Sequence, residues 1–214
     1  MAIEAGATCG ICYPDMTTVE YLWSFIKDEF KSKEDALREY SRWLPDADAE
    51  YVKNISFDAS ALEPMVTFNY KPDQVKTVRE MEGTPVNQIY IGSCTNGRIE
   101  DMATAAEILK GKTVARDVRC IIIPATQAIY KECIKRGYME AFIDAGCVVS
   151  TPTCGPCLGG YMGILAAGER CVSTTNRNFV GRMGHISSEI YLASPAVAAA
   201  SALTGYISDP REVL

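Results

Sequence analysis

The stretch Gln88-Ile-Tyr-Ile-Gly-Ser-Cys94-Thr-Asn-Gly97 joins a short apolar run to a cysteine among small polar residues. The apolar part predicts a buried strand, and the apolar spacing that begins at Ile99 predicts an amphipathic helix directly after it. Cys94 is therefore expected at the carboxyl end of a strand. In an open α/β sheet the loops at that edge converge on a crevice where ligands bind, so Cys94 is a candidate site residue.

The chain that follows repeats this alternation of strand and helix. Short apolar runs and amphipathic stretches come in turn, at residues 99–110, 120–123, 127–144, 147–150 and 171–174. Ser194 and Pro195 are typical of a helix start and Gly205 of a helix end, which predicts an alanine-rich helix between them. Together these signals predict an α/β domain with a mostly parallel sheet over residues 81–214.

The chain before this domain has a different texture. Residues 17–44 carry apolar side chains at helical spacing, whereas residues 51–57 and 65–68 alternate and contain β-branched side chains, which is typical of short strands. Residues 71–85 are polar and interrupted by proline and glycine, which indicates a linker. We therefore expect a smaller, truncated α/β domain over residues 1–80.

Composition and charge exclude several classes of protein. The 214 residues include 21 lysines and arginines against 27 aspartates and glutamates, a net charge of -6. This balance offers no basic surface for nucleic acid. No apolar run reaches the roughly 18 residues of a membrane helix, and the first residues lack the order of a signal peptide. We expect a cytoplasmic protein with neither a nucleic-acid nor a membrane partner.

Nine cysteines are many for a chain of this length. Without an export signal, disulfides are not expected, and free cysteine is most often buried. We therefore expect reduced, buried thiols at six positions, namely Cys9, Cys12, Cys120, Cys133, Cys147 and Cys171.

A second cysteine loop, Thr153-Cys-Gly-Pro-Cys-Leu-Gly-Gly160, also follows a predicted strand. Its Cys154 and Cys157 can therefore meet Cys94 at one edge of the sheet. Soft thiolates bind zinc, copper(I) or an iron-sulfur cluster. Three thiols rather than four favour a cluster with one iron open to substrate over a closed zinc site. Spacing alone leaves open a fourth ligand from another cysteine or His185, a redox dithiol, or two buried thiols beside a turn.

Three segments, in order, resemble the aconitase superfamily. They are Ile91-Gly-Ser-Cys-Thr-Asn-Gly-Arg98 with Glu100-Asp-Met102, then Thr153–Gly160, then Thr175-Asn-Arg-Asn-Phe-Val-Gly-Arg182. The resemblance covers nearly all of the chain and is strongest after Gln88. It implies a three-layer α/β/α domain with a mostly parallel sheet, in the C-terminal part of a large subunit.

The resemblance also implies a cofactor and a reaction. Cys94, Cys154 and Cys157 would be the three ligands of one [4Fe-4S] cluster, whose remaining iron would bind the substrate hydroxyl and carboxylate. The implied hydro-lyase reaction interconverts 2-isopropylmalate and 3-isopropylmalate by dehydration and rehydration, in leucine biosynthesis. The alternatives are a homoaconitase large subunit, in lysine or coenzyme B biosynthesis, and a non-catalytic metal-binding module.

Further residues are implied in the substrate pocket. Asn176, Arg177 and Arg182 match the family's substrate-binding segment, and arginine suits this role because a guanidinium binds a carboxylate bidentately. Glu4 lies in a segment that resembles one reaching the active site, although a glutamate this near a chain end is expected to be solvated. We expect His185 to be a structural hydrogen-bonding residue.

The family's histidine- and aspartate-bearing segments have no counterpart in this sequence, which contains one histidine. The resemblance implies that the swivelling domain, which supplies the serine base, is a separate small subunit and the partner of this chain. We therefore expect a truncated large subunit that is inactive by itself.

Overall fold

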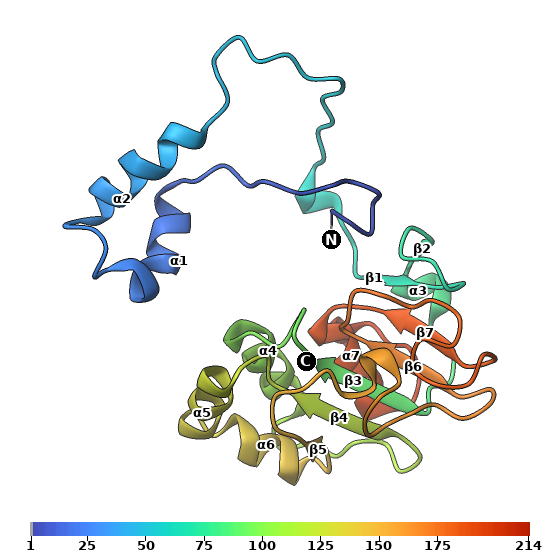
Figure 1. Cartoon of the computed structure of the whole chain (residues 1–214). Helices are drawn as coiled ribbons and strands as arrows, with labels where there is room; N and C mark the ends of the chain where they lie inside the picture. The colour runs from blue at the N-terminus through green and yellow to red at the C-terminus, as the bar shows by residue number, and fades with distance from the viewer. Residues whose placement is uncertain (1) are drawn as a thin grey trace. The chain divides into compact units, whose positions relative to one another are not determined.

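The computed structural model describes residues 2–214 (Figure 1). Their contacts form two compact units. The sheet unit contains Ile3–Ala5 and Ala61–Leu214, and the helical unit contains Ala2 and Gly6–Ser60. The sequence analysis placed the boundary between the two domains at residue 80. In the structure the boundary lies at residue 60, because residues 61–80 pack with the sheet.

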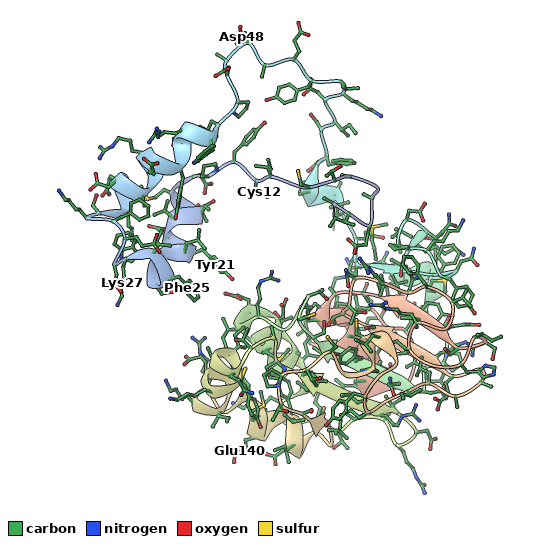
Figure 2. The ribbon with its side chains drawn as sticks, viewed as in Figure 1. Cys12, Tyr21, Phe25, Lys27, Asp48 and Glu140 are labelled. Carbon is green, nitrogen blue, oxygen red and sulfur yellow. The ribbon has the colours of Figure 1, made fainter. Side chains whose placement is uncertain are left out.

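The helical unit is built around two short helices. Its elements are α1 (Met16–Ile26), α2 (Lys33–Tyr40), the 3-10 turn η1 (Ser41–Trp43) and, at its end, η2 (Ala59–Ala61). Asp15 begins α1 because its carboxylate accepts a hydrogen bond from the Thr18 N–H at 2.7 Å. A small core of Val19, Ile26 and Ala36 joins the helices. Tyr21 and Phe25 of α1 are exposed (Figure 2).

The strand predicted at residues 51–57 is wrong, and the described residues 6–60 contain no strand. Val52, Ile55 and Phe57 are exposed. The alternating apolar side chains of this segment have no neighbouring strand to pair with and no core that buries them. The smaller α/β domain expected before the sheet is therefore not observed.

Five parallel strands form the sheet that the sequence predicts. They are β3 (Gln88–Gly92), β4 (Arg119–Ile123), β5 (Val148–Val149), β6 (Arg170–Ser173) and β7 (Glu189–Leu192), in the spatial order β5-β4-β3-β6-β7. From β3 the chain adds β4 and β5 on one side and then returns to add β6 and β7 on the other. The loops that leave β3 and β6 therefore diverge at a switch point, where open sheets bind ligands.

Alternate side chains of each strand pack on opposite faces of the sheet. Ile89 and Ile91 face a core formed with the helices, whereas Tyr90 packs beneath loop residues such as Leu165 and Met183. The helices of the first face are α4 (Ile99–Leu109), α5 (Gln127–Lys135), α6 (Tyr138–Asp144) and α7 (Pro195–Thr204). The α/β class and the parallel sheet are confirmed, but loops and the 3-10 turn η3 (Gly155–Leu158), rather than helices, cover the second face.

The ends of α7 match the sequence signals. Ser194 Oγ accepts a hydrogen bond from the Val197 N–H at 3.3 Å, and Gly205 ends the helix with φ +80°. Pro210–Glu212 then form the 3-10 turn η4. Across residues 2–214, no helix is both long and apolar enough to cross a membrane.

A small hairpin covers one edge of the sheet. β1 (Met65–Thr67) pairs with β2 (Val75–Thr77), and α3 (Val78–Met81) follows. Val66 forms an antiparallel bridge with Ala193, so β1 shields the β7 edge. The linker predicted over residues 71–85 is therefore wrong in part, because this segment contains β2 and α3. Two of its polar residues, Thr77 and Glu80, form the capping box that begins α3.

An ion pair at the amino edge of the sheet predicts how stability changes with pH. Glu169 accepts hydrogen bonds from both terminal nitrogens of Arg119 at 2.8 Å each, which lower the pKa of this carboxyl. A lowered pKa stabilises the fold above the ordinary value of 4.5, and the stabilisation is lost as the pH falls further. We expect Glu169→Gln to unfold at a lower temperature than the wild type at pH 7, with a difference that shrinks toward acid pH in thermal melts.

The size of this effect is limited because Arg119 is half-exposed, so we expect about 1 kcal/mol or less at pH 7. The control is Glu107→Gln, an exposed glutamate of α4 that forms no ion pair within residues 2–214. A Glu169→Gln difference that stays constant with pH would contradict the ion-pair explanation.

Candidate functional site

The loop that carries Cys94 leaves the sheet through a turn that requires glycine. Gly92 has φ +111°, and a Cβ there would lie 1.8 Å from the Ile123 carbonyl oxygen. Ser93 follows with φ +104°, and its N–H donates to the same oxygen at 3.0 Å. The chain therefore turns sharply at the end of β3, and Cys94 is exposed at the carboxyl edge of the sheet.

The loops after β3 and β6 are built in the same way. Ser93 Oγ lies 3.1 Å from Thr95 Oγ1, and Ser173 Oγ lies 2.9 Å from Thr175 Oγ1. In each loop the threonine N–H also donates to the serine oxygen, at 3.3 and 3.2 Å. The hydroxyl of Thr174 accepts a hydrogen bond from the last N–H of β3 at 2.9 Å. The two loops are therefore held side by side at the switch point.

The Cys154 and Cys157 pair lies on η3, against the second face of the sheet. Tyr90 Oη donates to the Cys154 carbonyl at 2.9 Å. A Cβ at Gly155 would lie 2.9 Å from that hydroxyl and 2.5 Å from Ile123 Cδ1. The turn is therefore pressed against β3 and β4, with Cys154 half-buried and Cys157 buried.

The three thiols converge around the Tyr90 hydroxyl. Burial raises the pKa of Tyr90, and the nearby Cys157, Cys154 and Cys94 raise it further. Cys94 has the largest raising effect on the pKa of Cys154, because two thiolates that lie close together repel each other. The structure therefore brings together the three cysteines that the sequence singled out.

The chemistry of the three thiols can be compared with what a metal ion or a cluster needs. Among residues 2–214, no three histidine, cysteine or acidic side chains are grouped closely enough to hold one metal ion. The cysteine ligands of a cubane cluster bind different iron atoms and therefore lie further apart than the ligands of one ion. Three soft thiolates on two loops, with glycines that permit close backbone approach, suit such a cluster.

Asn176 and Arg177 share one partner, Glu4, whose side chain the sequence analysis expected in solvent. Asn176 Nδ2 donates to Glu4 Oε1 at 2.6 Å, and Arg177 Nε donates to the same oxygen at 3.2 Å. The Glu4 side chain is only 8% exposed, so it is not solvated as expected. Its pKa is lowered, first by a hydrogen bond from its own backbone N–H and then by Arg177 and Asn176, against the raising effect of burial.

Arg182 retains capacity to bind a ligand. Its Nε is buried and has no hydrogen-bond partner within residues 2–214. The guanidinium lies near the thiol group, since it lowers the pKa of Cys154. A buried donor without a partner costs about 1–3 kcal/mol, so an anionic ligand that pairs with it would gain that free energy. The arginine is therefore suited to a carboxylate bound beside the thiols.

Asn178 positions the loop between Asn176 and Arg182, a role that sequence reasoning missed. The side chain is fully buried, and its Nδ2 donates to Thr67 Oγ1 at 3.2 Å and to the Ile190 carbonyl at 3.3 Å. Thr67 Oγ1 also accepts from the Leu192 N–H at 2.9 Å. The signal for this role was Asn178 itself, the fourth polar residue of the motif, but its partners on β1 and β7 are distant in sequence.

The remaining cysteines divide into two groups. Cys120, Cys133, Cys147 and Cys171 are buried and free, as predicted. Cys9 and Cys12 are exposed, and the prediction that they are buried is wrong (Figure 2 labels Cys12). They lie on an extended segment outside any helix or strand, so no element buries them.

His185 has the structural role expected of it. Its Nδ1 lies 2.8 Å from Ser187 Oγ and accepts a hydrogen bond from the Ser187 N–H at 3.1 Å. These bonds fix the turn that leads to β7.

The chain is similar to known proteins over its whole length. A model of the aconitase family (aconitate hydratase) matches residues 1–85 and 75–205. The 3-isopropylmalate dehydratase large subunits of Geobacter metallireducens and Geobacter sulfurreducens are each 58% identical to the chain over 214 residues, and that of Citrifermentans bemidjiense is 59% identical. Each match covers 100% of this chain and 50% of the relative, so the chain spans about half the length of the curated relatives it matches.

The close approach at Gly92 predicts a large loss of stability on adding one methyl group. Gly92→Ala places Cβ against a backbone oxygen that cannot move without breaking β4, so we expect a loss of about 3 kcal/mol or more in urea unfolding. The matched control is Gly111→Ala, since Gly111 has φ +71° but open space around its Cβ position. Its cost should stay near 1–2 kcal/mol. Equal losses in the two variants would mean that backbone conformation, and not the contact with Ile123, sets the effect.

The pairing of Glu4 predicts how its carboxyl titrates. By carbon NMR, we expect the midpoint of Glu4 to lie below the ordinary glutamate value. Arg177→Met should raise this midpoint but leave it below that value, because the hydrogen bond from the backbone N–H of Glu4 remains. The control, Arg38→Met, removes an exposed arginine that pairs with Asp35 instead. A Glu4 midpoint that does not respond to Arg177→Met would refute the contact.

Proposed function

The chain belongs to the aconitase family, and from this membership we propose that it forms the cluster-binding part of a hydro-lyase large subunit. The observation that carries the proposal is the meeting of three thiols near Arg182, whose buried Nε has no partner within residues 2–214. Cys94, Cys154 and Cys157 would hold a [4Fe-4S] cluster. When bound, the cluster would supply a Lewis-acidic iron that polarises a hydroxyl group of the substrate.

The other polar residues of the site bind and orient the substrate. Arg182, with its open donor, pairs with one substrate carboxylate beside the thiols. Arg177 binds a second carboxylate through the terminal nitrogens that its Nε bond to Glu4 leaves available. Glu4 holds Arg177 and Asn176 in place before the substrate arrives, so less conformational freedom is lost on binding.

The proposed substrates are 2-isopropylmalate and 3-isopropylmalate, which the enzyme would interconvert in leucine biosynthesis by removing and re-adding water. Relatives that are 54–59% identical to the chain are 3-isopropylmalate dehydratase large subunits, which supports this assignment over homoaconitase chemistry. We propose a small subunit with the swivelling domain as the partner that supplies the base. Nine free cysteines and an oxygen-sensitive cluster suit a reducing compartment such as the cytoplasm.

The proposal is tested by anaerobic reconstitution of the chain with iron and sulfide. We expect the wild type to take up iron and sulfide in a ratio near one and to turn brown, whereas Cys94→Ala, Cys154→Ala and Cys157→Ala each lose the cluster signal in electron paramagnetic resonance. The matched control is the double variant Cys9→Ser and Cys12→Ser, which removes an exposed pair with the same Cys-x-x-Cys spacing. This variant should bind the cluster as the wild type does.

Two outcomes separate the alternatives. Stoichiometric zinc without iron uptake would favour a non-catalytic metal-binding module. If the cluster assembles, the chain should be inactive alone, and activity on 3-isopropylmalate should require the rest of the large subunit and a small subunit. Activity on homoaconitate but not on 3-isopropylmalate in that assembly would favour the homoaconitase alternative.

A further inference from the structure

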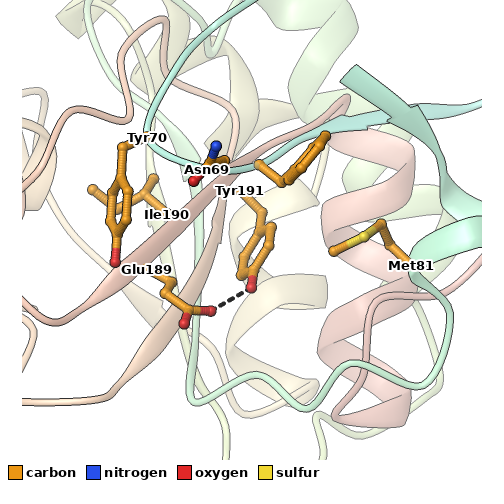
Figure 3. Close-up of a pocket in the computed structure, with 7 residues that line it drawn as sticks. Asn69, Tyr70, Met81, Glu189, Ile190 and Tyr191 are labelled. Atoms are coloured by element: carbon orange, nitrogen blue, oxygen red, sulfur yellow. Dashed lines mark hydrogen bonds between the residues drawn. The ribbon is translucent and has the colours of Figure 1, made fainter. Parts of the chain in front are cut away.

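A cavity of about 250 Å³ lies beside the edge strand β7, away from the thiol loops. Its lining combines three aromatic rings, two other apolar side chains, an amide and one carboxylate, from Phe68, Asn69, Tyr70, Met81, Glu189, Ile190 and Tyr191. Figure 3 shows Tyr70 and Tyr191 on either side of the Glu189 carboxylate. Glu189 is the first residue of β7, so the cavity reaches the amino end of this strand, whereas the thiol loops leave the sheet at its carboxyl edge.

The turn that supplies two of the lining residues is strained. Asn69 and Tyr70 have φ +56° and +60°, the conformation of a type I′ turn. Asparagine tolerates this conformation, but the second position strongly favours glycine, and a tyrosine there costs roughly 1–2 kcal/mol. Strained backbone conformations of this kind are often found at binding sites. The Tyr70 ring forms one wall of the cavity.

Glu189 has an oxygen available to a ligand. Its Oε2 accepts hydrogen bonds from Arg170 Nε, at 2.9 Å, and from Tyr191 Oη. Its Oε1 accepts none from residues 2–214. The pKa of Glu189 is lowered, first by the bond from Tyr191, so the carboxylate is charged at neutral pH. Of the seven described lining residues, Glu189 carries the only charge.

Aromatic rings around one carboxylate form a site for a cation. The face of each ring is negative and attracts a cation, and the effect grows when water is excluded. Phe68 already attracts one, since Lys76 Nζ lies 4.8 Å from the centroid of its ring. Glu189 Oε2 is already paired with Arg170 and Tyr191, so a ligand would add its hydrogen bond at Oε1, and a cation would gain charge attraction there that a neutral ligand would not.

We propose that this cavity binds a small organic cation with N–H donors, of the guanidinium class. The planar group stacks between Tyr70 and Tyr191 and donates a hydrogen bond to Glu189 Oε1. A guanidinium suits the site better than an ammonium, because it is planar and more weakly hydrated. The proposal does not depend on the thiol site or on the hydro-lyase assignment.

The test compares two probes of nearly the same shape, methylguanidinium and its neutral analogue methylurea. Both are titrated into the whole chain while amide shifts of residues 68–70 and 189–191 are followed by NMR. We expect saturable binding of methylguanidinium in the millimolar range, which is usual for so small a ligand, and no saturable binding of methylurea.

Variants separate the carboxylate from the ring. Glu189→Gln should weaken methylguanidinium binding about tenfold, whereas the control Glu132→Gln, which alters another arginine-paired carboxylate, should leave it unchanged. Tyr70→Leu should weaken binding about fivefold, and Tyr70→Phe, which keeps the ring, should bind within about twofold of wild type. Circular dichroism confirms that each variant is folded.

Each opposite outcome overturns the proposal. Equal binding of methylurea would show that charge has no role, and equal binding by Glu189→Gln would exclude the carboxylate. No saturable binding of methylguanidinium by the folded wild-type chain would exclude the site altogether.

Discussion

The contact between Gly92 and the carbonyl oxygen of Ile123 is the constraint on which the site depends. A Cβ at position 92 would lie 1.8 Å from that oxygen. The end of β3 can therefore approach β4 this closely only because residue 92 is glycine. The same oxygen accepts the Ser93 N–H, which turns the chain off the sheet just before Cys94. Tyr90, two residues before Gly92, holds the Cys154 turn against the sheet by donating a hydrogen bond to the Cys154 carbonyl. Both cysteine loops are thus positioned by two residues of one strand, Tyr90 and Gly92.

Charge in the site is balanced unevenly. Glu4 satisfies Asn176 and part of Arg177, whereas Arg182 Nε is buried without a partner in the described chain. One arginine is therefore held in position by the protein, and in the function proposed above the other would gain its partner from a ligand. This asymmetry suits a dicarboxylate, because one end of the molecule meets a preorganised group and the other end supplies a missing hydrogen bond.

The two units differ in how well they bury apolar surface. The sheet unit has a core on each face of β3, whereas the helical unit has a core of three buried residues and exposes Phe25, Trp43 and Phe57. The sequence pattern predicts the observed helices and strands where a core buries their apolar side chains. In residues 51–57, where no core or partner strand exists, the alternating pattern predicted a strand that is absent.

The sequence by itself determined the parallel sheet, the last helix and the three cysteines, because local periodicity, capping residues and thiol spacing act over a few neighbouring positions. Tertiary structure alone decided that Glu4 is buried against Asn176 and Arg177, since their separation of more than 170 positions leaves no local signal. It also decided that Tyr70 and Glu189 line one cavity, because the hairpin packs on β7 through contacts between segments about 120 residues apart.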